Sequence, residues 1–230
     1  MATIIPLQKI PDLSLILPQQ SEEHMNYRLF NRPGSGGFVV EAALALAETP
    51  FELQEFESKP GTPLPEDFRA TNPWGQVPVL LLPDGTTMTE AAAILIHLAA
   101  AFPDKGLGPV PGTSAHAKFL RWLVFASVNL YEAVLRRGYP FRYTTDPGGY
   151  KALGAAANTR LKDGLAVLDT AVAPGPFLLG EQMSLADIYF AMLFTWYHGQ
   201  IEAPHLVAMK DGVKAHTMVG PIWRRHFGDR

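Results

Sequence analysis

The sequence predicts a mixed α/β domain followed by an all-helical domain, and three observations carry that prediction. Between residues 26 and 102, strand-like runs alternate with runs of helical composition. A segment rich in proline and glycine at 103–113 interrupts the pattern. Beyond it, apolar residues recur at helical spacing and no run is typical of a strand. We therefore expect an N-terminal extension at 1–24, an α/β domain at 25–103, a linker at 104–113 and a helical domain at 114–230.

The α/β half opens with a strand, a helix and a second strand. Residues 27–30 form the first predicted strand, which ends at a turn over 31–34. Residues 38–47 are rich in Ala and Leu, which favours a helix. Residues 51–57 alternate apolar with polar side chains, as a half-exposed strand does. Such a strand–helix–strand unit predicts a right-handed parallel crossover.

The rest of the α/β half is predicted as a helix, a hairpin and a helix. The expected elements are a short helix at 66–70, a strand at 77–82, a turn at 83–86 and a return strand at 87–88. The last helix runs to about residue 102, with Thr89 as its candidate cap and Glu90 in its first turn. The predicted order is therefore βαβαββα.

Three helices are predicted in the second half. Two of them cover residues 114–137 and 150–173, where apolar side chains follow helical spacing. The third begins at Ser184, because Ser184 and Asp187 have the spacing of a capping box.

Composition narrows the possible chemistry. The 230 residues include 19 Lys and Arg, 22 Asp and Glu, seven histidines and no cysteine. Without cysteine the chain has no disulfide, no Cys-ligated zinc and no thiol nucleophile of its own, and the scattered histidines predict no metal site. The net charge of −3 argues against a nucleic-acid partner. No run approaches the ~20 apolar residues of a membrane span, so we expect a cytoplasmic protein with no membrane partner.

Two motifs resemble a known family. The run NPWGQVPVL at 72–80, followed by Asp84-Gly85 and by TEAAAIL at 89–95, resembles the glutathione-binding half of cytosolic glutathione transferases, including bacterial ones. The runs FLLGE at 177–181 and SLADI at 184–188 resemble the C-terminal helix of the same family. The resemblance covers residues 26 to about 195. It implies a thioredoxin-like N-terminal domain, an all-helical C-terminal domain, a homodimer, and glutathione as co-substrate.

The resemblance also implies where glutathione binds. Val77, the residue before a cis-proline at Pro78, is expected to pair with the cysteinyl backbone of glutathione, with Gln76 beside it in the binding site. Glu90 and Ala91 are expected to hold the γ-glutamyl carboxylate at the N-terminus of a helix, where free N–H groups favour an anion. The family usually has serine where Ala91 stands, and the lost hydrogen bond is worth roughly 1.5–3 kcal/mol. We therefore expect weak glutathione binding, and Glu90 can alternatively be only a first-turn charge.

A glutathione thiolate also needs a donor, because the pKa of a free cysteine thiol is near 8.5. The family supplies a Tyr, Ser or Cys after the first strand, where this chain has RPGSGG at 32–37. In that register a serine-type member has its hydroxyl at Gly34 and a cysteine-type member its thiol at Gly36. Ser35 is our catalytic candidate, and Gly34 and Gly36 are candidates for binding glutathione. Two alternatives remain open. Ser35 is only a turn residue, or N–H groups of the loop replace its hydroxyl as donors to the thiolate.

The second substrate is expected between the domains. The candidate wall residues are Trp122, Asn129, Tyr139 and Arg142, and their aromatic character predicts a small apolar electrophile. The leading hypothesis is a transferase that conjugates glutathione to such an electrophile, in the sense of detoxification. The alternatives are a glutathione-dependent isomerase and a non-catalytic binding module. The C-terminal segment 223–227 lies outside the resemblance.

Overall fold

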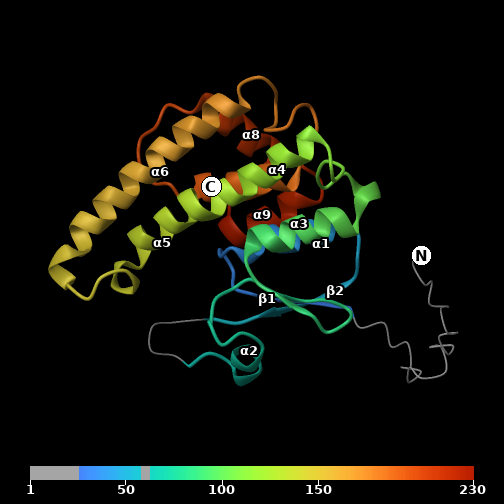
Figure 1. The fold of residues 1–230 in the computed structure, drawn as a ribbon, viewed down its shortest axis with the longest axis horizontal. Helices are drawn as coiled ribbons and strands as arrows, with labels where there is room; N and C mark the ends of the chain where they lie inside the picture. Colours follow the sequence, from blue (N-terminus) through green and yellow to red (C-terminus); the bar gives the residue numbers. More distant parts are fainter. Residues whose placement is uncertain (1–25, 58–62) are drawn as a thin grey trace, which may run out of the picture.

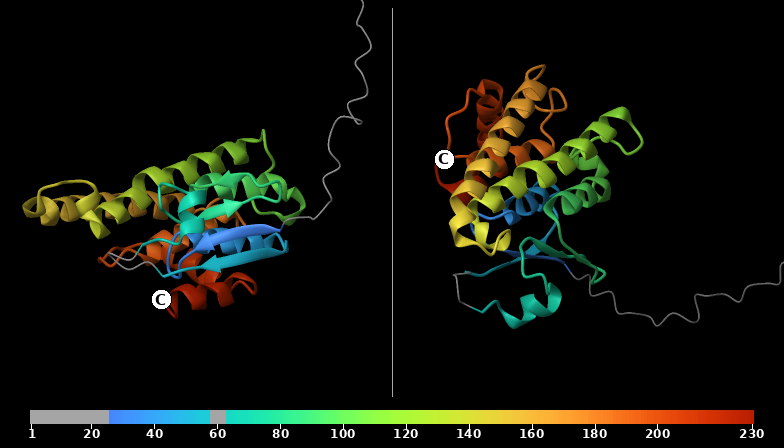
Figure 2. Two further views of the ribbon diagram at one scale, coloured as in Figure 1. Left: turned by 90° about the horizontal axis from the view of Figure 1, so that it is seen from below. Right: turned by 60° about the vertical axis from the view of Figure 1, so that its left-hand side comes forward.

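The computed structural model describes residues 26–57 and 63–230. The expected extension at 1–24 therefore lies outside the described residues. Figure 1 shows a small sheet with α1 and α3 on one face, α2 on the other, and the helical half on the side of α1 and α3. The right-hand view of Figure 2 shows the same arrangement, with α2 on the face away from the helical half.

The first half has the predicted order of elements. Their bounds are β1 Tyr27–Asn31, α1 Gly37–Leu46, β2 Phe51–Glu55, α2 Glu66–Thr71, β3 Val79–Leu81, β4 Thr87–Met88 and α3 Ala91–Ala101. A short 3₁₀ turn, η2 (Pro103–Lys105), follows within the proline- and glycine-rich segment. The observed βαβαββα order confirms the predicted fold of this half.

The sheet has the strand order β2-β1-β3-β4. Strand β1 runs parallel to β2 and antiparallel to β3, and β4 returns antiparallel to β3. Because side chains alternate along a strand, Leu29 of β1 packs in the main core whereas Phe30 packs with Phe68 of α2 in a second, small cluster. The two faces of the sheet therefore have separate cores, and the cleft described below opens beyond the ends of these strands.

The start of α3 corrects one expectation. The N-cap residue is Glu90 rather than Thr89, and no side chain caps the helix. The backbone of Glu90 has a positive φ of 64°, an uncommon conformation for a residue with a Cβ. Among the residues that the structure describes, no side chain accepts from the first N–H groups of α3.

The second half consists of helices. Their bounds are α4 Ser114–Phe125, η3 Ala126–Tyr131, α5 Glu132–Gly138, η4 Pro140–Arg142, η5 Pro147–Gly149, α6 Tyr150–Val172, α7 Leu185–Thr195, α8 Pro204–Ala215 and α9 Val219–Phe227. The predicted helix at 114–137 is interrupted by η3, which is π-helical. The capping box at Ser184 and Asp187 is present as predicted. Helices α8 and α9 carried no sequence signal that we identified.

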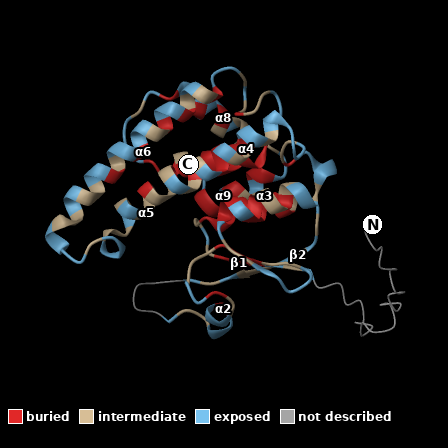
Figure 3. Cartoon of the chain, in the orientation of Figure 1, coloured by how far each residue is buried: buried red, intermediate tan, exposed pale blue. Residues whose placement is uncertain are grey.

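One apolar core joins the two halves. Buried residues of α1, α3, α4, α7 and α9 belong to a single cluster, and Figure 3 shows this buried centre with exposed faces on α5 and α6. Helix α9 packs on α1 and brings the end of the chain against the α/β domain. In the described ranges no helix is both long and apolar enough to cross a membrane.

Candidate active site between the two domains

Two cavities lie side by side where the domains meet. The first has a volume of about 510 Å³ and is bounded by the loop after β1, the segment before β3, α5 and Trp196. The second has a volume of about 540 Å³ and is bounded by the N-terminus of α3, η3 and Tyr189. Gln76, Tyr131, Leu135 and Arg142 line both cavities. The two cavities therefore form the two ends of one cleft.

Asn31 organises the loop after β1. Its side-chain oxygen accepts hydrogen bonds from the Arg32 N–H at 2.7 Å and from the Ser35 hydroxyl at 2.9 Å. The Ser35 oxygen in turn accepts the Gly37 N–H at 3.3 Å. Ser35 lines the first cavity, but its hydroxyl proton is used inside the loop.

The two glycines beside Ser35 make different contacts. Gly34 has a φ of +72° and donates its N–H to Nδ1 of His226 at 3.0 Å. Gly36 lies against Tyr131, because a Cβ built on Gly36 would stand 2.5 Å from the Tyr131 hydroxyl oxygen. Real Cβ atoms essentially never make a contact that short. The Tyr131 hydroxyl thus occupies the space that a side chain at position 36 would need.

Tyr131 is held firmly in place. Its ring packs edge-on against Trp196, with centroids 5.5 Å apart, and against Tyr189 at 6.3 Å. Burial raises the pKa of Tyr131 to about 12, and this outweighs the opposite effects of Arg32 and of the Gly36 N–H. The phenol therefore remains a protonated hydrogen-bond donor at neutral pH.

The segment before β3 presents backbone groups to the cleft. The Val77–Pro78 peptide bond is cis, as the resemblance implies. The Asn72 side chain donates to the Gln76 carbonyl at 2.8 Å and accepts the Trp74 N–H at 3.2 Å, which fixes the path of the loop. Gln76 and Val77 line the first cavity, and Pro78 lines the second.

The N-terminus of α3 opens onto the second cavity. Glu90 and Ala91 line that cavity, and Ser127 and Tyr189 line it from the helical domain. The Ser127 and Tyr189 hydroxyls lie 3.2 Å apart. Burial raises the pKa of Tyr189 far above its ordinary value, with a smaller opposing effect from Ser127, so this phenol is also neutral. Two hydroxyls from the helical domain therefore line the cavity in which a serine at position 91 is missing.

The charged lining of the first cavity is basic among the described residues. Arg32, Arg137 and Arg142 line it together with His198. Arg137 donates hydrogen bonds to the Trp196 carbonyl and to the side-chain oxygen of Asn158. The guanidinium carbon of Arg142 lies 4.4 Å from the centroid of the Tyr139 ring. This charge distribution favours an anionic ligand.

The predicted wall residues separate into two pairs. Tyr139 and Arg142 line the first cavity. Trp122 does not line any of the three described cavities, because it is buried in the core against Phe190 and Phe125. Asn129 lies outside them too, and its side-chain oxygen accepts a hydrogen bond from Arg160 at 2.8 Å. The cleft is lined instead by Ser127, Tyr131 and Leu135, which follow one another at four-residue intervals on another side of the same helical stretch.

Sequence reasoning missed Tyr131, Ser127 and Tyr189. Tyr131 and Ser127 lie in η3, and a local change to π-helical geometry has no signature that we recognised in the sequence. It also missed Glu41, the one acidic residue of α1, which is buried. A charged residue within an otherwise apolar run was the available signal for Glu41.

Comparisons with known proteins agree with this architecture. Family models of the glutathione S-transferase N-terminal and C-terminal domains match residues 39–101 and 151–225. Glutathione S-transferase GstA of Escherichia coli O157:H7 is 30% identical over 172 residues, which cover 74% of this chain and 81% of GstA. The uncharacterized GST-like protein YncG of Escherichia coli K12 is 29% identical over 193 residues, which cover 81% of this chain and 91% of YncG.

Solved structures give the same result. BphK, a bacterial GST in a ternary complex, matches with a TM-score of 0.74 and 28% identity over 86% of this chain and 98% of BphK. A sphingomonad glutathione S-transferase complexed with glutathione matches with a TM-score of 0.72 and 29% identity over 86% of this chain and 97% of its own. The thioredoxin-like first domain and the helical second domain are those of these neighbours. This chain belongs to the glutathione S-transferase family.

Proposed function

We propose that this protein is a glutathione transferase that binds reduced glutathione along the cleft and joins its sulfur to a small apolar electrophile. The observation that carries the proposal is the continuity of the cleft. The segment before the cis-proline, the open N-terminus of α3 and the Tyr131 hydroxyl all line connected cavities. The glutathione complex of the sphingomonad relative supports this choice of ligand.

The second cavity suits the γ-glutamyl end of glutathione. A carboxylate at the start of α3 meets free N–H groups and the positive end of the helix dipole. Ala91 removes the serine hydroxyl expected from the family, which costs roughly 1.5–3 kcal/mol or a factor of about 10–150 in affinity. Ser127 lines the same cavity, and we propose that its hydroxyl compensates for part of this loss.

Two hydroxyls compete for the role of donor to the sulfur. Ser35 donates its proton to Asn31, so it must break that bond before it serves a thiolate. Tyr131 stays protonated and lies in the space beside Gly36, where the family register places the thiol of cysteine-type members. We propose Tyr131 as the hydrogen-bond donor that holds the glutathione thiolate, and Ser35 as a residue that shapes the loop.

The reaction then follows from these contacts. The sulfur loses its proton to solvent, and the Tyr131 hydroxyl and the basic lining of the first cavity stabilise the negative charge. The thiolate forms a carbon–sulfur bond with the electrophile, and either a leaving group departs or a proton adds to the activated double bond. Tyr139, Trp196 and Leu135 give the electrophile an apolar wall, with the Arg142 guanidinium at its edge.

We also propose that the protein is cytoplasmic, because reduced glutathione requires a reducing compartment. We further propose that it forms a homodimer. Val124 and Val128 lie four residues apart on the outer side of α4 and η3 and are 53% and 60% exposed. Such side chains favour contact with a second copy of the chain. Light scattering tests the mass, and a Val128→Glu variant should shift it toward the monomer.

Isothermal titration with reduced glutathione tests the main proposal. We expect saturable heat and a thermal shift, followed by a conjugate when an activated aryl chloride is added. The dipeptide Cys-Gly is the matched control, and it should bind at least about tenfold more weakly because it lacks the γ-glutamyl carboxylate. No heat and no thermal shift at millimolar glutathione would refute the proposal.

A second candidate function is a binding module without catalysis, and one observation favours it. Neither position 34 nor position 36 carries a side chain, and the Ser35 proton is engaged in the loop. Glutathione binding without conjugation of any electrophile tested would support this alternative. An isomerase would instead form product while the total concentration of free thiol stays constant.

A further inference from the structure

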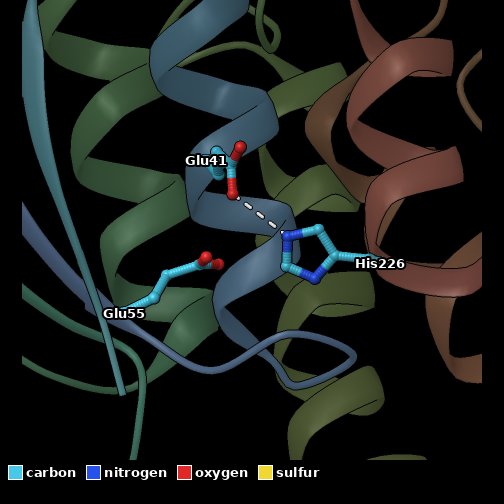
Figure 4. Close-up of side chains that lie close together, drawn as sticks. All are labelled: Glu41, Glu55 and His226. Atoms are coloured by element: carbon cyan, nitrogen blue, oxygen red, sulfur yellow. Dashed lines mark hydrogen bonds and ion pairs between the residues drawn. The ribbon is translucent and has the colours of Figure 1, made fainter. Parts of the chain in front are cut away.

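A buried histidine from the last helix contacts the loop after β1. His226 lies in α9, and its Nδ1 accepts the Gly34 N–H at 3.0 Å. Its Nε2 lies 3.0 Å from a carboxylate oxygen of Glu41 in α1. Figure 4 shows the imidazole pointing from α9 toward Glu41. Glu41, His226 and the Gly34 amide thus form a series of two hydrogen bonds that links α1 and α9 to the loop after β1.

This geometry selects one form of the imidazole. A backbone N–H only donates, so Nδ1 must carry a lone pair, and the proton must reside on Nε2. The Nε2–H then donates to Glu41, whose carboxylate fixes this tautomer. In the other tautomer, and in the imidazolium, a proton on Nδ1 would face the Gly34 N–H and break the bond.

The charges around His226 support the same form. Arg225 bonds both Glu41 and Glu55 and lies 3.2 Å from Nε2 of His226. Burial alone would raise the pKa of Glu41, but hydrogen bonds from His226 and Arg225 lower it below its ordinary value. Glu41 therefore stays ionised as an acceptor for the Nε2–H of His226.

The cluster is not assigned to a metal. Glu41, Glu55 and His226 offer ligand atoms within 4.8 Å of one another. The Arg225 guanidinium bonds both carboxylates and supplies the positive charge they need. The cluster is better explained as the attachment of α9 to the α/β domain.

We propose that His226 is a positioning residue of the glutathione site, which holds the Gly34–Gly36 segment against the cleft through the Gly34 amide. This inference rests on the proposed function. A Cβ on Gly34 would lie only 3.5 Å from the His226 carbonyl oxygen, so the loop and α9 are in close contact. Ordering a loop residue costs conformational entropy, and with His226 in place this cost is met on folding rather than on ligand binding. The Tyr131 contact at Gly36 depends on the same loop position.

Two polar substitutions separate the ends of the imidazole. In His226→Asn the amide oxygen reaches the position of Nδ1, so the acceptor for Gly34 is kept while the contact with Glu41 is lost. In His226→Gln the amide reaches toward the position of Nε2, so the contact with Glu41 is kept while the acceptor for Gly34 is lost. Phe227→Leu is the control, because Phe227 is buried on the same helix against Phe38.

The first measurement is hydrogen exchange of the Gly34 amide without any ligand. We expect wild type, His226→Asn and Phe227→Leu to protect this amide, and His226→Gln to lose at least about tenfold of the protection. The second measurement is kcat/KM for glutathione, where we expect a fall on the order of 10- to 100-fold for His226→Gln alone.

The outcomes distinguish the two proposals. Equal protection and equal kcat/KM in His226→Asn and His226→Gln would overturn the role of His226 while leaving the proposed function intact. A wild type that protects Gly34 but binds no glutathione would overturn the proposed function instead. If His226→Gln does not fold, a His226→Asn variant that loses protection of Gly34 overturns the inference.

Discussion

The two walls of the cleft supply different chemistry. The α/β wall presents mainly backbone: the loop at 32–35, the segment before Pro78 and the first turn of α3. The helical wall presents side-chain donors, namely Tyr131, Ser127 and the guanidinium of Arg142. A site can therefore lack hydroxyls on one wall and still offer hydrogen-bond donors from the other.

The comparison makes opposite predictions for the two walls. Removing a donor from the helical wall should lower activity, because the one hydroxyl that the α/β half brings to the two described cavities, that of Ser35, already donates to Asn31. A side chain added to the α/β wall at Gly36 should collide with Tyr131 of the helical wall. A hydroxyl added at Ala91, which lines the second cavity, should strengthen ligand binding.

Tyr131→Phe is expected to have the largest effect. It removes a hydrogen bond to a charged sulfur, worth roughly 1.5–3 kcal/mol, so kcat/KM should fall by a factor of about 10–150. Ser35→Ala is the matched control and should change kcat/KM by less than about threefold. The pH at which glutathione bound to the enzyme ionises, followed by thiolate absorbance, should rise in Tyr131→Phe. The reverse ranking of the two variants would assign the donor role to Ser35.

Gly36→Ala tests whether the two walls meet at Tyr131. The new Cβ would stand 2.5 Å from the Tyr131 oxygen, and overpacking of this kind costs typically 1–3 kcal/mol. We expect kcat/KM to fall by a factor of about 5–150. In a Tyr131→Phe background the same substitution should cost much less, because the hydroxyl is absent. A double-mutant cycle measures this difference, and strictly additive effects would show that the contact carries no function.

Ala91→Ser tests the opposite outcome on the α/β wall. Position 91 is the first residue of α3 and lines the second cavity, so a serine hydroxyl there has room to meet a carboxylate. Glutathione affinity should rise by about tenfold, consistent with a charged hydrogen bond of at least about 1.5 kcal/mol. Isothermal titration measures the gain, and the Cys-Gly dipeptide should show none. An unchanged affinity would indicate that Ser127 already satisfies the carboxylate.

The success of the sequence analysis depended on how local each signal was. The capping box at Ser184 and the strand at 51–55 were predictable because their signals lie within a few neighbouring residues. Glu90 was misplaced by one position, because only the folded backbone shows its positive φ. Helix boundaries of this kind are set by tertiary contacts as much as by composition.

The helical wall was predicted least well. Regular helical spacing pointed to Trp122 and Asn129, whereas Ser127, Tyr131 and Leu135, on another side of the same helical stretch, line the cleft. The contact between His226 and Gly34 joins residues 192 positions apart, and no local pattern encodes such a distance. Glycine at 34 is explained by its positive φ, and glycine at 36 by the Tyr131 side chain that lies against it.

Glu41→Gln is expected to have the smallest effect, and it shows how the helical half is tied to the α/β half. Glu41 has its pKa below the ordinary value of 4.5, because the bonds from His226 and Arg225 outweigh its burial. A carboxyl with a lowered folded-state pKa contributes stability that is present above its unfolded pKa and lost as pH falls through the folded value. The difference in unfolding free energy between wild type and Glu41→Gln should therefore be constant near neutral pH and shrink below about pH 4.5.

Urea unfolding at several pH values measures that difference, and Glu55→Gln is the control because its carboxylate also bonds Arg225 but is more exposed. The Glu55 variant should show a smaller difference in unfolding free energy at neutral pH, since exposed ion pairs contribute about 0–1 kcal/mol. If the gap between wild type and Glu41→Gln instead widened as pH fell, the bonds to Glu41 would not be its source. The attachment of α9 would then depend on apolar packing against Phe38 alone, and the loop after β1 would owe its position to that packing rather than to the charge on Glu41.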